Sequence, residues 1–230
     1  MPDNNFLLKP IAHIRTDFKE KFGIPRQSGI VKELTARIVF LPEFRDPEAL
    51  RGIEGFDYLW LIWRFSANRH DGWRPTVRPP RLGGNARMGV FATRSPFRPN
   101  PMGLSSVKLI AVEHTANEGT VLIVSGADLL DNTPIYDIKP YIPYTDCHPD
   151  CRGGFADSGA PEPLEVNISD ELIAVLPVDK RSALISVLAQ DPRPAYQNDP
   201  DRIYGLSFAG YSVRFSVSEK TLTVTELSAE

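Results

Sequence analysis

The most distinctive chemical feature of the sequence is a run of arginines in its first half. Between Arg64 and Arg98 the chain has eight arginines, no lysine and one acidic residue, Asp71. Eight positive charges and one negative charge give this stretch +7, although the whole chain of 230 residues has a net charge of −3. Guanidinium groups stay charged, pair with phosphates and stack on bases, so this composition is typical of a surface that binds a polyanion, most simply a nucleic acid. The alternative is that some of these arginines pair with carboxylates or stabilise turns.

The residues between these arginines hold the backbone rigid. Two adjoining blocks, residues 73–87 and 89–103, are rich in proline and glycine. A basic loop that is merely solvated does not need such residues, whereas a rigid backbone loses less conformational entropy on binding. A second rigid and polar stretch, residues 131–141, carries acidic side chains. Both stretches are therefore candidates for a functional site.

Several familiar catalytic signatures are missing from the sequence. It has no glycine-rich dinucleotide or P-loop motif, no G-x-S-x-G nucleophile motif and no H-E-x-x-H zinc motif. Cys147 and Cys151 flank His148, but C-x₃-C differs from the usual C-x₂-C spacing and no second ligand pair follows. We therefore expect a flexible loop at this point and no metal site. Two cysteines are also too few for a disulfide framework, which favours a reducing compartment.

The elements that must position these residues are mostly strands. The uninterrupted apolar run over residues 58–63 predicts a strand buried on both faces. Asp46, Pro47 and Glu48 predict the start of a short helix. Because turns and no long amphipathic helix separate the strands, the first part of the chain is expected to form a closed or nearly closed β-barrel. The runs typical of strands cover residues 11–15, 36–40, 58–63, 88–93, 107–112 and 121–124.

The composition changes near residue 146. Residues 146–163 are rich in Gly, Pro, Asp and Ser, which is typical of a linker loop. Beyond it, two segments have helical spacing, and residues 206–217 and 222–227 resemble a hairpin. We therefore expect a mainly β protein with a β-barrel domain over residues 5–145, a linker over 146–163 and a small α+β subdomain over 164–230.

No targeting or membrane segment is visible in the sequence. The first residues lack a basic region followed by an apolar one, so no secretory signal is apparent. No apolar run approaches the roughly 18 residues that a membrane span requires. A cytoplasmic protein is expected.

The blocks at residues 73–87 and 89–103 also carry a family resemblance. With Lys19-Glu20-Lys21-Phe22, Pro25-Arg26-Gln27 and residues 189–196, they resemble the TsaA-like family, the TrmO tRNA methyltransferases, over the whole chain. The resemblance implies transfer of a methyl group from S-adenosylmethionine to N6 of threonylcarbamoyladenosine, the modified purine beside the anticodon of certain tRNAs. It also implies a non-Rossmann β-barrel cofactor domain and a homodimer with the cofactor near the subunit interface.

The same resemblance implies three segments and one pair of residues that contact the cofactor. Ser66 and Ala67 stand where relatives have a polar pair such as His-Gln, so backbone contacts are expected there in place of side-chain contacts. The implied cofactor-binding residues are Pro25, Arg26, Gln27, Ser66, Ala67, Arg94, Leu104, Asp131, Asn132, Thr133 and Pro134.

The implied reaction needs little covalent help, since positioning dominates an in-line methyl transfer. The N6 atom of the substrate is a ureido-type nitrogen, which is poorly nucleophilic until its proton leaves, so a base or a polarising cation would help. We expect Asp137 to accept the proton, Lys139 and Arg98 to assist electrostatically and Asn100 to orient the substrate. The alternative for Asp137 is a structural ion pair with Lys139 or with an arginine.

The tRNA is expected to meet the arginine-rich segment at Arg74, Arg78, Arg81 and Arg87. Tyr141 is expected to stack on an exposed base, as aromatic side chains commonly do with the bases of single-stranded loops; Phe97 is a second candidate. Two other functions are consistent with the same residues. One is an RNA-binding module without catalysis, and the other is a regulator that senses S-adenosylmethionine without consuming it.

Overall fold

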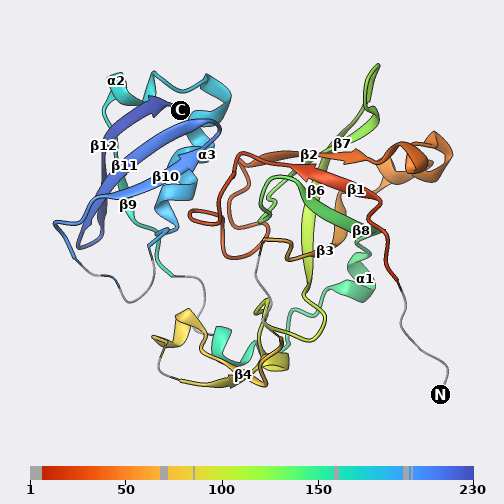
Figure 1. Cartoon of the computed structure of the whole chain (residues 1–230), viewed down its shortest axis with the longest axis horizontal. Helices are drawn as coiled ribbons and strands as arrows, with labels where there is room; N and C mark the ends of the chain where they lie inside the picture. Colours follow the sequence, from red (N-terminus) through yellow and green to blue (C-terminus); the bar gives the residue numbers. More distant parts are fainter. Residues whose placement is uncertain (1–6, 68–71, 85, 158–160, 194–196, 198) are drawn as a thin grey trace.

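A computed structural model of the chain describes residues 7–67, 72–84, 86–157, 161–193, 197 and 199–230. Figure 1 shows two units of β-structure beside each other, one formed by the first part of the chain and one by the last. The two cysteines lie in the segment that runs from the first unit to the second. None of the helices in the described residues is long and apolar enough to cross a membrane.

The first unit is a closed ring of six antiparallel strands. Their order is β1-β2-β7-β6-β3-β8, and β8 pairs back with β1, so the ring has no free edge. The side chains of Ile14, Ile38, Leu59, Leu61 and Leu122 fill its interior and are completely buried. The strands are β1 (Ala12–Arg15), β2 (Thr35–Phe40), β3 (Tyr58–Arg64), β6 (Met102–Thr115), β7 (Gly119–Ser125) and β8 (Thr133–Pro140). The prediction of a mainly β fold is confirmed.

Strand β3 differs from its prediction in one respect. Leu59, Leu61 and Trp63 point into the ring and are buried, but Trp60 and Ile62 between them are only half-buried. The prediction of a strand buried on both faces is wrong, because a ring has one interior and its outer face remains open here. On this outer face, Trp60 Nε1 donates a hydrogen bond of 2.8 Å to Asp146 Oδ2.

The sixth strand, β8, was not among the predicted strands. Pro134 and Pro140 lie within it and obscure the alternation that marks a strand in the sequence. The chain enters β8 through Asn132, which has a φ of 62° and whose N–H donates to Ile14 O at 2.8 Å. Asparagine tolerates this left-handed conformation better than most residues.

Short elements connect the strands. Between β2 and β3 lie the 3₁₀ helices η1 (Pro42–Phe44), η2 (Pro47–Leu50) and η3 (Ile53–Gly55). The predicted short helix is confirmed, since Asp46 Oδ1 caps η2 by accepting from Glu48 N at 3.0 Å.

The arginine-rich segment forms a small hairpin of β4 (Thr76–Val77) and β5 (Met88–Gly89), with η4 (Pro80–Leu82) between these strands. In Figure 1 this hairpin lies below both units, at the label β4. The predicted strand over residues 88–93 is wrong beyond Gly89. The chain turns there into η5 (Val90–Ala92), which ends with Thr93 N donating to Val90 O at 3.1 Å.

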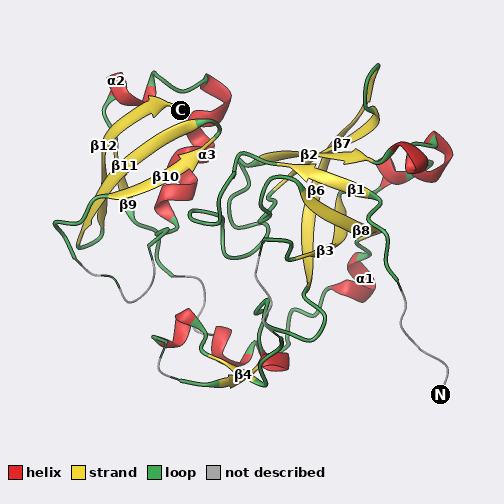
Figure 2. Ribbon diagram, in the orientation of Figure 1, coloured by secondary structure: helices red, strands yellow, loops and turns green. Residues whose placement is uncertain are grey.

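The second unit is a four-stranded sheet with order β10-β11-β12-β9, and α3 packs against it, as Figure 2 shows. The expected single arm over residues 206–217 is in fact two strands, because Ala209 and Gly210 have φ values of 54° and 81° and reverse the chain. The elements of this unit are β9 (Glu165–Asn167), α2 (Asp170–Ile173), α3 (Val178–Ala189), β10 (Tyr204–Phe208), β11 (Tyr211–Ser218) and β12 (Thr221–Ala229). Along the chain, α1 (Pro143–Asp146) and η6 (Gly154–Ala156) come between the strands of the first unit and those of the second.

The segment between β1 and β2 joins the two units. Its residues Phe18, Val31 and Leu34 belong to the same hydrophobic core as the strands and α3 of the second unit. Lys180 on α3 forms an ion pair with Asp17, with 2.7 Å between Nζ and Oδ2 and both side chains mostly buried. These contacts place residues 24–27 at the boundary between the units, where the candidate site lies.

Candidate functional site

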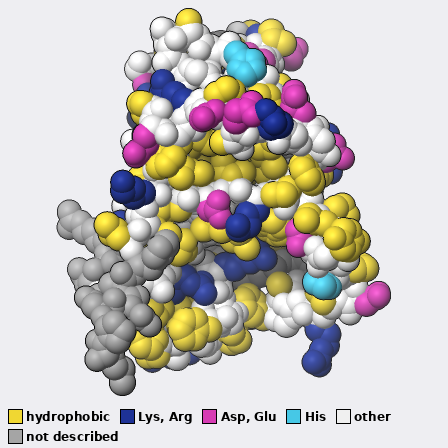
Figure 3. Space-filling model, turned by 90° about the vertical axis from the view of Figure 1, so that its right-hand side faces the viewer, with side chains coloured by type: hydrophobic (Ala, Val, Ile, Leu, Met, Phe, Trp, Pro, Cys, Tyr) yellow, Lys and Arg dark blue, Asp and Glu magenta, His cyan; other side chains and the backbone are white. Residues whose placement is uncertain are grey.

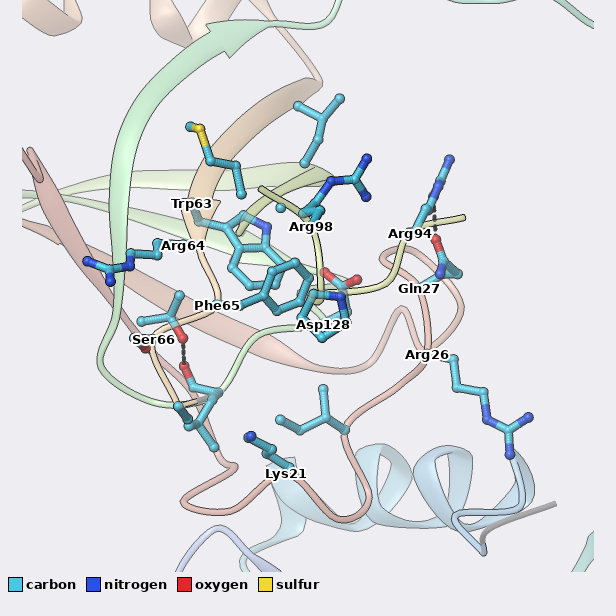
Figure 4. A pocket seen from close by; sticks show the side chains of 18 of the residues that line it. Lys21, Arg26, Gln27, Trp63, Arg64, Phe65, Ser66, Arg94, Arg98 and Asp128 are labelled. Atoms are coloured by element: carbon cyan, nitrogen blue, oxygen red, sulfur yellow. Dashed lines mark hydrogen bonds between the residues drawn. The ribbon is translucent and has the colours of Figure 1, made fainter. Parts of the chain in front are cut away.

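A cavity of about 590 Å³ lies where the ring, the segment before β2 and the end of the arginine-rich segment meet. Figure 4 shows its side chains, with Arg94 and Gln27 on one side and Arg64 on the other. The cavity size is within the range of small-molecule and cofactor sites. Its lining residues are Lys21, Ile24, Pro25, Arg26, Gln27, Trp60, Trp63, Arg64, Phe65, Ser66, Ala67, Thr93, Arg94, Pro96, Arg98, Asn100, Met102, Gly103, Leu104, Asp128, Leu130 and Thr133.

The structure brings most of the expected cofactor-binding residues to this one cavity. They come from four separate parts of the chain: the segment before β2, the end of β3, the loop after η5 together with β6, and the start of β8. No periodic pattern in the sequence indicates that these four parts meet in the fold. The expected residues that line the cavity are Pro25, Arg26, Gln27, Ser66, Ala67, Arg94, Leu104 and Thr133.

One wall of the cavity is held by polar contacts between distant segments. The guanidinium of Arg94 donates a hydrogen bond to Gln27 Oε1, which ties the arginine-rich segment to the segment before β2 (Figure 4). Arg26 donates from Nη2 to Arg193 O at 3.3 Å. Arg193 is itself oriented by Asp191 through hydrogen bonds of 2.8 and 2.9 Å. This wall therefore depends on the C-terminal unit as well as on the ring.

Asp131, Asn132 and Pro134 do not line the cavity. Asp131 Oδ1 accepts from Thr16 N at 3.0 Å, and Asn132 Oδ1 accepts from Arg15 Nη1 at 3.0 Å. Pro134 lies opposite His13 in the β1–β8 pair. These three residues fasten the end of β1 to the start of β8, beside the buried Thr133 that reaches the cavity.

Asp128 is a cavity residue that the sequence analysis missed. Its Oδ1 accepts a hydrogen bond of 2.6 Å from Ser105 Oγ, and Ser105 Oγ accepts one of 3.0 Å from Trp63 Nε1. Burial raises the pKa of Asp128 above its ordinary value, although the hydrogen bond from Ser105 and the positive charge of Arg94 act in the opposite direction. The one feature of the sequence that could have indicated Asp128 is its place between two apolar residues, Ala127 and Leu129. Both follow β7 in the chain, and both are buried.

Two of the four expected catalytic residues, Arg98 and Asn100, line the cavity. Arg98 Nη1 donates to Thr93 O at 3.1 Å, which holds its side chain across the loop. The other two, Asp137 and Lys139, are absent from the lining. They form an ion pair with 3.1 Å between Oδ2 and Nζ and are both about half exposed. This is the structural pairing given above as the alternative for Asp137.

A smaller cleft of about 340 Å³ lies on the outer face of the ring next to the main cavity. Lys139, Trp60 and Asp146 line it, and Leu104 lines both the cleft and the cavity. Hydrogen bonds from Ile142 N and Trp60 Nε1 lower the pKa of Asp146 below its ordinary value.

Tyr141 packs beside this cleft. Its ring lies 5.6 Å from that of Trp60 and 6.2 Å from that of Tyr58, measured between centroids. The structure therefore places Tyr141 against two aromatic side chains of β3.

The arginine-rich hairpin exposes aromatic as well as basic side chains. Trp73 and Phe91 are 52% and 73% exposed, and their rings are stacked with centroids 6.4 Å apart. The guanidinium of Arg74 lies 5.7 Å from the centroid of the Phe97 ring. Arg78 and Arg87 are exposed, and within the described residues no carboxylate forms an ion pair with either of them or with Arg74. The side chain of Arg81 lies outside the described part of the chain.

On the face shown in Figure 3, Lys and Arg side chains gather in a hollow below a band of hydrophobic side chains.

Cys147 and Cys151 are exposed and are not joined by a disulfide. The described residues contain no group of three or more His, Cys, Asp or Glu side chains arranged to hold a metal ion.

Comparisons with known proteins cover nearly the whole chain. Residues 13–147 match the tRNA-methyltransferase O N-terminal domain, and residues 161–230 match the TrmO C-terminal domain. The chain is 40% identical over 232 residues to the tRNA (adenine(37)-N6)-methyltransferase of Escherichia coli K12, covering 97% of this chain and 98% of that one. It is 43% identical over 207 residues to a putative S-adenosylmethionine-dependent methyltransferase, RcsF, of Pseudomonas aeruginosa, covering 86% and 87%. The crystal structure of TrmO from Pseudomonas aeruginosa has a TM-score of 0.79 and 31% identity, covering 98% of this chain and all of that one.

Proposed function

This chain belongs to the tRNA-methyltransferase O family, and we propose that its main cavity is where the methyl transfer of an S-adenosylmethionine-dependent tRNA (adenine-N6)-methyltransferase takes place. The substrate is threonylcarbamoyladenosine next to the anticodon. The observation that carries the assignment is the convergence of four distant segments on a cavity of about 590 Å³ beside an exposed arginine-rich hairpin.

The cavity lining fits S-adenosylmethionine in size and in chemistry. Trp63, Phe65 and Leu104 provide the apolar surface that a purine ring needs, while Gln27 and Arg94 provide polar groups for the rest of the molecule. Pro25, Arg26, Ser66, Ala67 and Thr133 complete the proposed binding residues. When bound, the cofactor supplies a methyl group on a positively charged sulfur. The proposed role of Asp131, Asn132 and Pro134 is indirect. They hold the start of β8 against β1, and this strand places Thr133 at the cavity.

The residues of the chain contribute position and charge to the reaction. Arg98, fixed by the carbonyl of Thr93, is proposed to stabilise negative charge on the carbonyl oxygen of the ureido group as N6 loses its proton. Asn100 is proposed to orient the same group by hydrogen bonding. Asp137 and Lys139 remain candidates for base and helper only if the tRNA reaches the smaller cleft, because their ion pair lies outside the main cavity.

The tRNA is proposed to lie on the arginine-rich hairpin. Arg74, Arg78 and Arg87 are exposed and free of carboxylate partners among the described residues, so they are available for phosphates. Trp73 and Phe91 beside them offer ring faces to unpaired bases of the anticodon loop. We assign Arg81 to the same surface from the sequence alone. Tyr141 is proposed to contact a more distant part of the loop, at the smaller cleft.

A cytoplasmic homodimer is also part of the proposal. Large hydrophobic side chains stand exposed beside the smaller cleft: Leu104 is 57% exposed, and Tyr144 on α1 is 87% exposed. Such side chains are typical of an interface, and Leu104 links this surface to the cavity. Light scattering coupled to size-exclusion chromatography is expected to give twice the 25.7 kDa mass of the chain.

The decisive experiment is methylation of defined tRNA. The purified protein, S-adenosylmethionine and tRNA from cells that lack the methylation are incubated, and the nucleosides are analysed by mass spectrometry. We expect threonylcarbamoyladenosine to gain the mass of one methyl group, and tRNA without the threonylcarbamoyl group to serve as the control. Binding of both tRNA and cofactor without any methylated product would favour the two non-catalytic functions.

A further inference from the structure

We propose that Asp128 accepts the proton from N6 during methyl transfer, and that Ser105 and Trp63 position its carboxylate for this step. This inference rests on the proposed function, because it assigns a role within the same cavity. It concerns a residue that neither the sequence motifs nor the expected catalytic set included.

The composition of the cavity wall favours Asp128 as the base. Asp128 is the single carboxylate among its described lining residues, and that lining contains no histidine, cysteine or tyrosine. Lysine and arginine are its other ionisable side chains: Lys21, Arg26, Arg64, Arg94 and Arg98. Lysine and arginine are cationic at neutral pH and have no free electron pair to take a proton, whereas a carboxylate oxygen can accept one. The wall therefore offers one evident proton acceptor, in a cavity whose other ionisable side chains are cationic.

The carboxylate of Asp128 is held in place by a short chain of hydrogen bonds. Ser105 Oγ has one hydrogen, and because it accepts the indole N–H of Trp63 at 3.0 Å, its own hydrogen is directed to Asp128 Oδ1 at 2.6 Å. Ser105 is 1% exposed and Trp63 is 7% exposed, so both donors are buried. A relay of two buried donors fixes one oxygen of Asp128 and limits rotation of the other. This is the support that a base needs if it is to meet a substrate in one geometry.

The surroundings of Asp128 also affect its basicity. Burial raises the pKa of Asp128, which makes its carboxylate a better proton acceptor than a solvated aspartate. The hydrogen bond from Ser105 and the positive charge of Arg94 act against this rise in the pKa of Asp128. Asp137 does not line this cavity, is about half exposed and is paired with Lys139 at 3.1 Å.

The step is balanced without any further reagent. N6 of the substrate forms a bond to the methyl carbon while the carbon–sulfur bond breaks and its electron pair remains on sulfur. The proton of N6 passes to the Asp128 carboxylate. The products are the methylated nucleoside, S-adenosylhomocysteine and a protonated Asp128, which then loses its proton to water.

The main alternative role for Asp128 is to bind the cofactor through its ammonium or hydroxyl groups. The test therefore measures binding and chemistry separately in Asp128→Asn, which keeps an acceptor for Ser105 but has little capacity to take a proton. Titration calorimetry with S-adenosylhomocysteine, a tRNA binding assay and single-turnover methylation between about pH 5 and pH 9 are applied to each variant. Glu113→Gln, which removes an exposed carboxylate on β6, is the matched control.

We expect Asp128→Asn to reduce the single-turnover rate by about 10²- to 10⁴-fold, the usual range for a general base, with both affinities within about threefold of the parent. We expect Ser105→Ala to lower the single-turnover rate less than Asp128→Asn does, because the base remains but loses its positioning contact. We also expect it to move the acidic limb of the pH–rate profile to higher pH, because it removes a hydrogen bond that lowers the pKa of Asp128. If Asp128→Asn proves unstable, Asp128→Ala with added formate replaces it, and formate is expected to restore the rate.

Three results overturn the assignment. The first is an Asp128→Asn variant that binds the cofactor poorly but reacts at the parent rate once saturated. The second is loss of the chemical step in Asp137→Asn while Asp128→Asn keeps it. The third is an Asp128→Ala variant that formate does not rescue. An inactive parent protein contradicts the proposed function instead, so the two failures are distinguishable.

Discussion

Trp63 and Gly103 face each other directly across the β3–β6 pair, and the indole ring occupies the space that a side chain at position 103 would need. A Cβ atom built on Gly103 lies 2.7 Å from Cδ2 of the ring and closer still to Cε2 and Cζ2. The missing side chain therefore lets the ring lie flat against β6 with its Nε1 directed at Ser105. The orientation of Asp128 depends in turn on this contact.

Gly103→Ala is expected to displace the Trp63 ring and destabilise the fold by about 1–3 kcal/mol, the usual cost of overpacking. The measurement is urea unfolding followed by tryptophan fluorescence. Gly205→Ala is the matched control, because Gly205 also lies in a strand and a Cβ built on it meets no atom within 4 Å. Equal stability of the two variants would show that the Trp63 ring has room to move.

Asp146 is expected to make stability depend on pH. Its pKa is lowered in the folded protein, so its contribution is present above the unfolded value of about 3.8 and is lost as the pH falls through the folded pKa. Asp146→Asn should therefore lower the melting temperature at pH 7, and the difference from the parent should shrink below about pH 4. Asp150→Asn, at an exposed acid in the same loop, is the control. A difference that stays constant with pH would indicate that lost packing, and not charge, causes the effect.

Binding of tRNA is expected to weaken steeply with salt, because each neutralised phosphate releases counterions. Replacing Arg74, Arg78 or Arg87 by Ala should each reduce the slope of log K against log salt by about 1, with little effect on S-adenosylhomocysteine affinity. Lys220→Ala, in the turn between β11 and β12, is the control for overall charge. A slope unchanged by all three arginine substitutions would move the RNA surface away from this hairpin.

The exposed ring pair of Trp73 and Phe91 is expected to bind unpaired bases. Trp73→Ala should weaken binding of an anticodon stem-loop by about 1–3 kcal/mol, whereas Trp73→Phe should retain most of the affinity because it keeps a ring face. Fluorescence anisotropy with a labelled stem-loop measures the effect, and a duplex without a loop is the comparison. Equal losses for loop and duplex would mean that Trp73 supports the hairpin and does not stack on bases.

Local patterns in the sequence predicted much of the ring but not all of it. The strand around Ile14 was found because residues 11–15 alternate, and those around Ile38 and Leu61 were found because residues 36–40 and 58–63 form short runs typical of strands. Burial along all three strands alternates, as it does in a ring with one interior. Strand β8 was missed because Pro134 and Pro140 interrupt its pattern. The turn at Ala209 was missed because a positive φ at alanine is unusual, and only the following Gly210 hints at it.

The candidate site, like the ring, was predicted from the sequence only in part. The arginine-rich blocks are local, and their composition alone predicted a basic surface. The contact between Arg94 and Gln27 joins residues 67 positions apart, and no periodicity in the chain indicates it. Asp128 escaped notice because a single acid after a strand is common, and its importance depends on Ser105 and Trp63, which fold toward it from two other strands.

Binding of the cofactor is expected to need no metal ion. Gln27 and Arg94 hold one wall of the cavity together, and the described residues contain no cluster of three or more metal-binding side chains. Calorimetric titration with S-adenosylhomocysteine should therefore give the same saturable binding with and without a chelator. Gln27→Ala should weaken this binding about tenfold, or about 1.4 kcal/mol, because it removes a cavity side chain and releases Arg94. Gln190→Ala, at the end of α3, changes the same residue type outside the cavity lining and should have no effect. Loss of binding in the chelator would contradict the metal-free prediction, and an unchanged affinity in Gln27→Ala would remove this wall from the cofactor site.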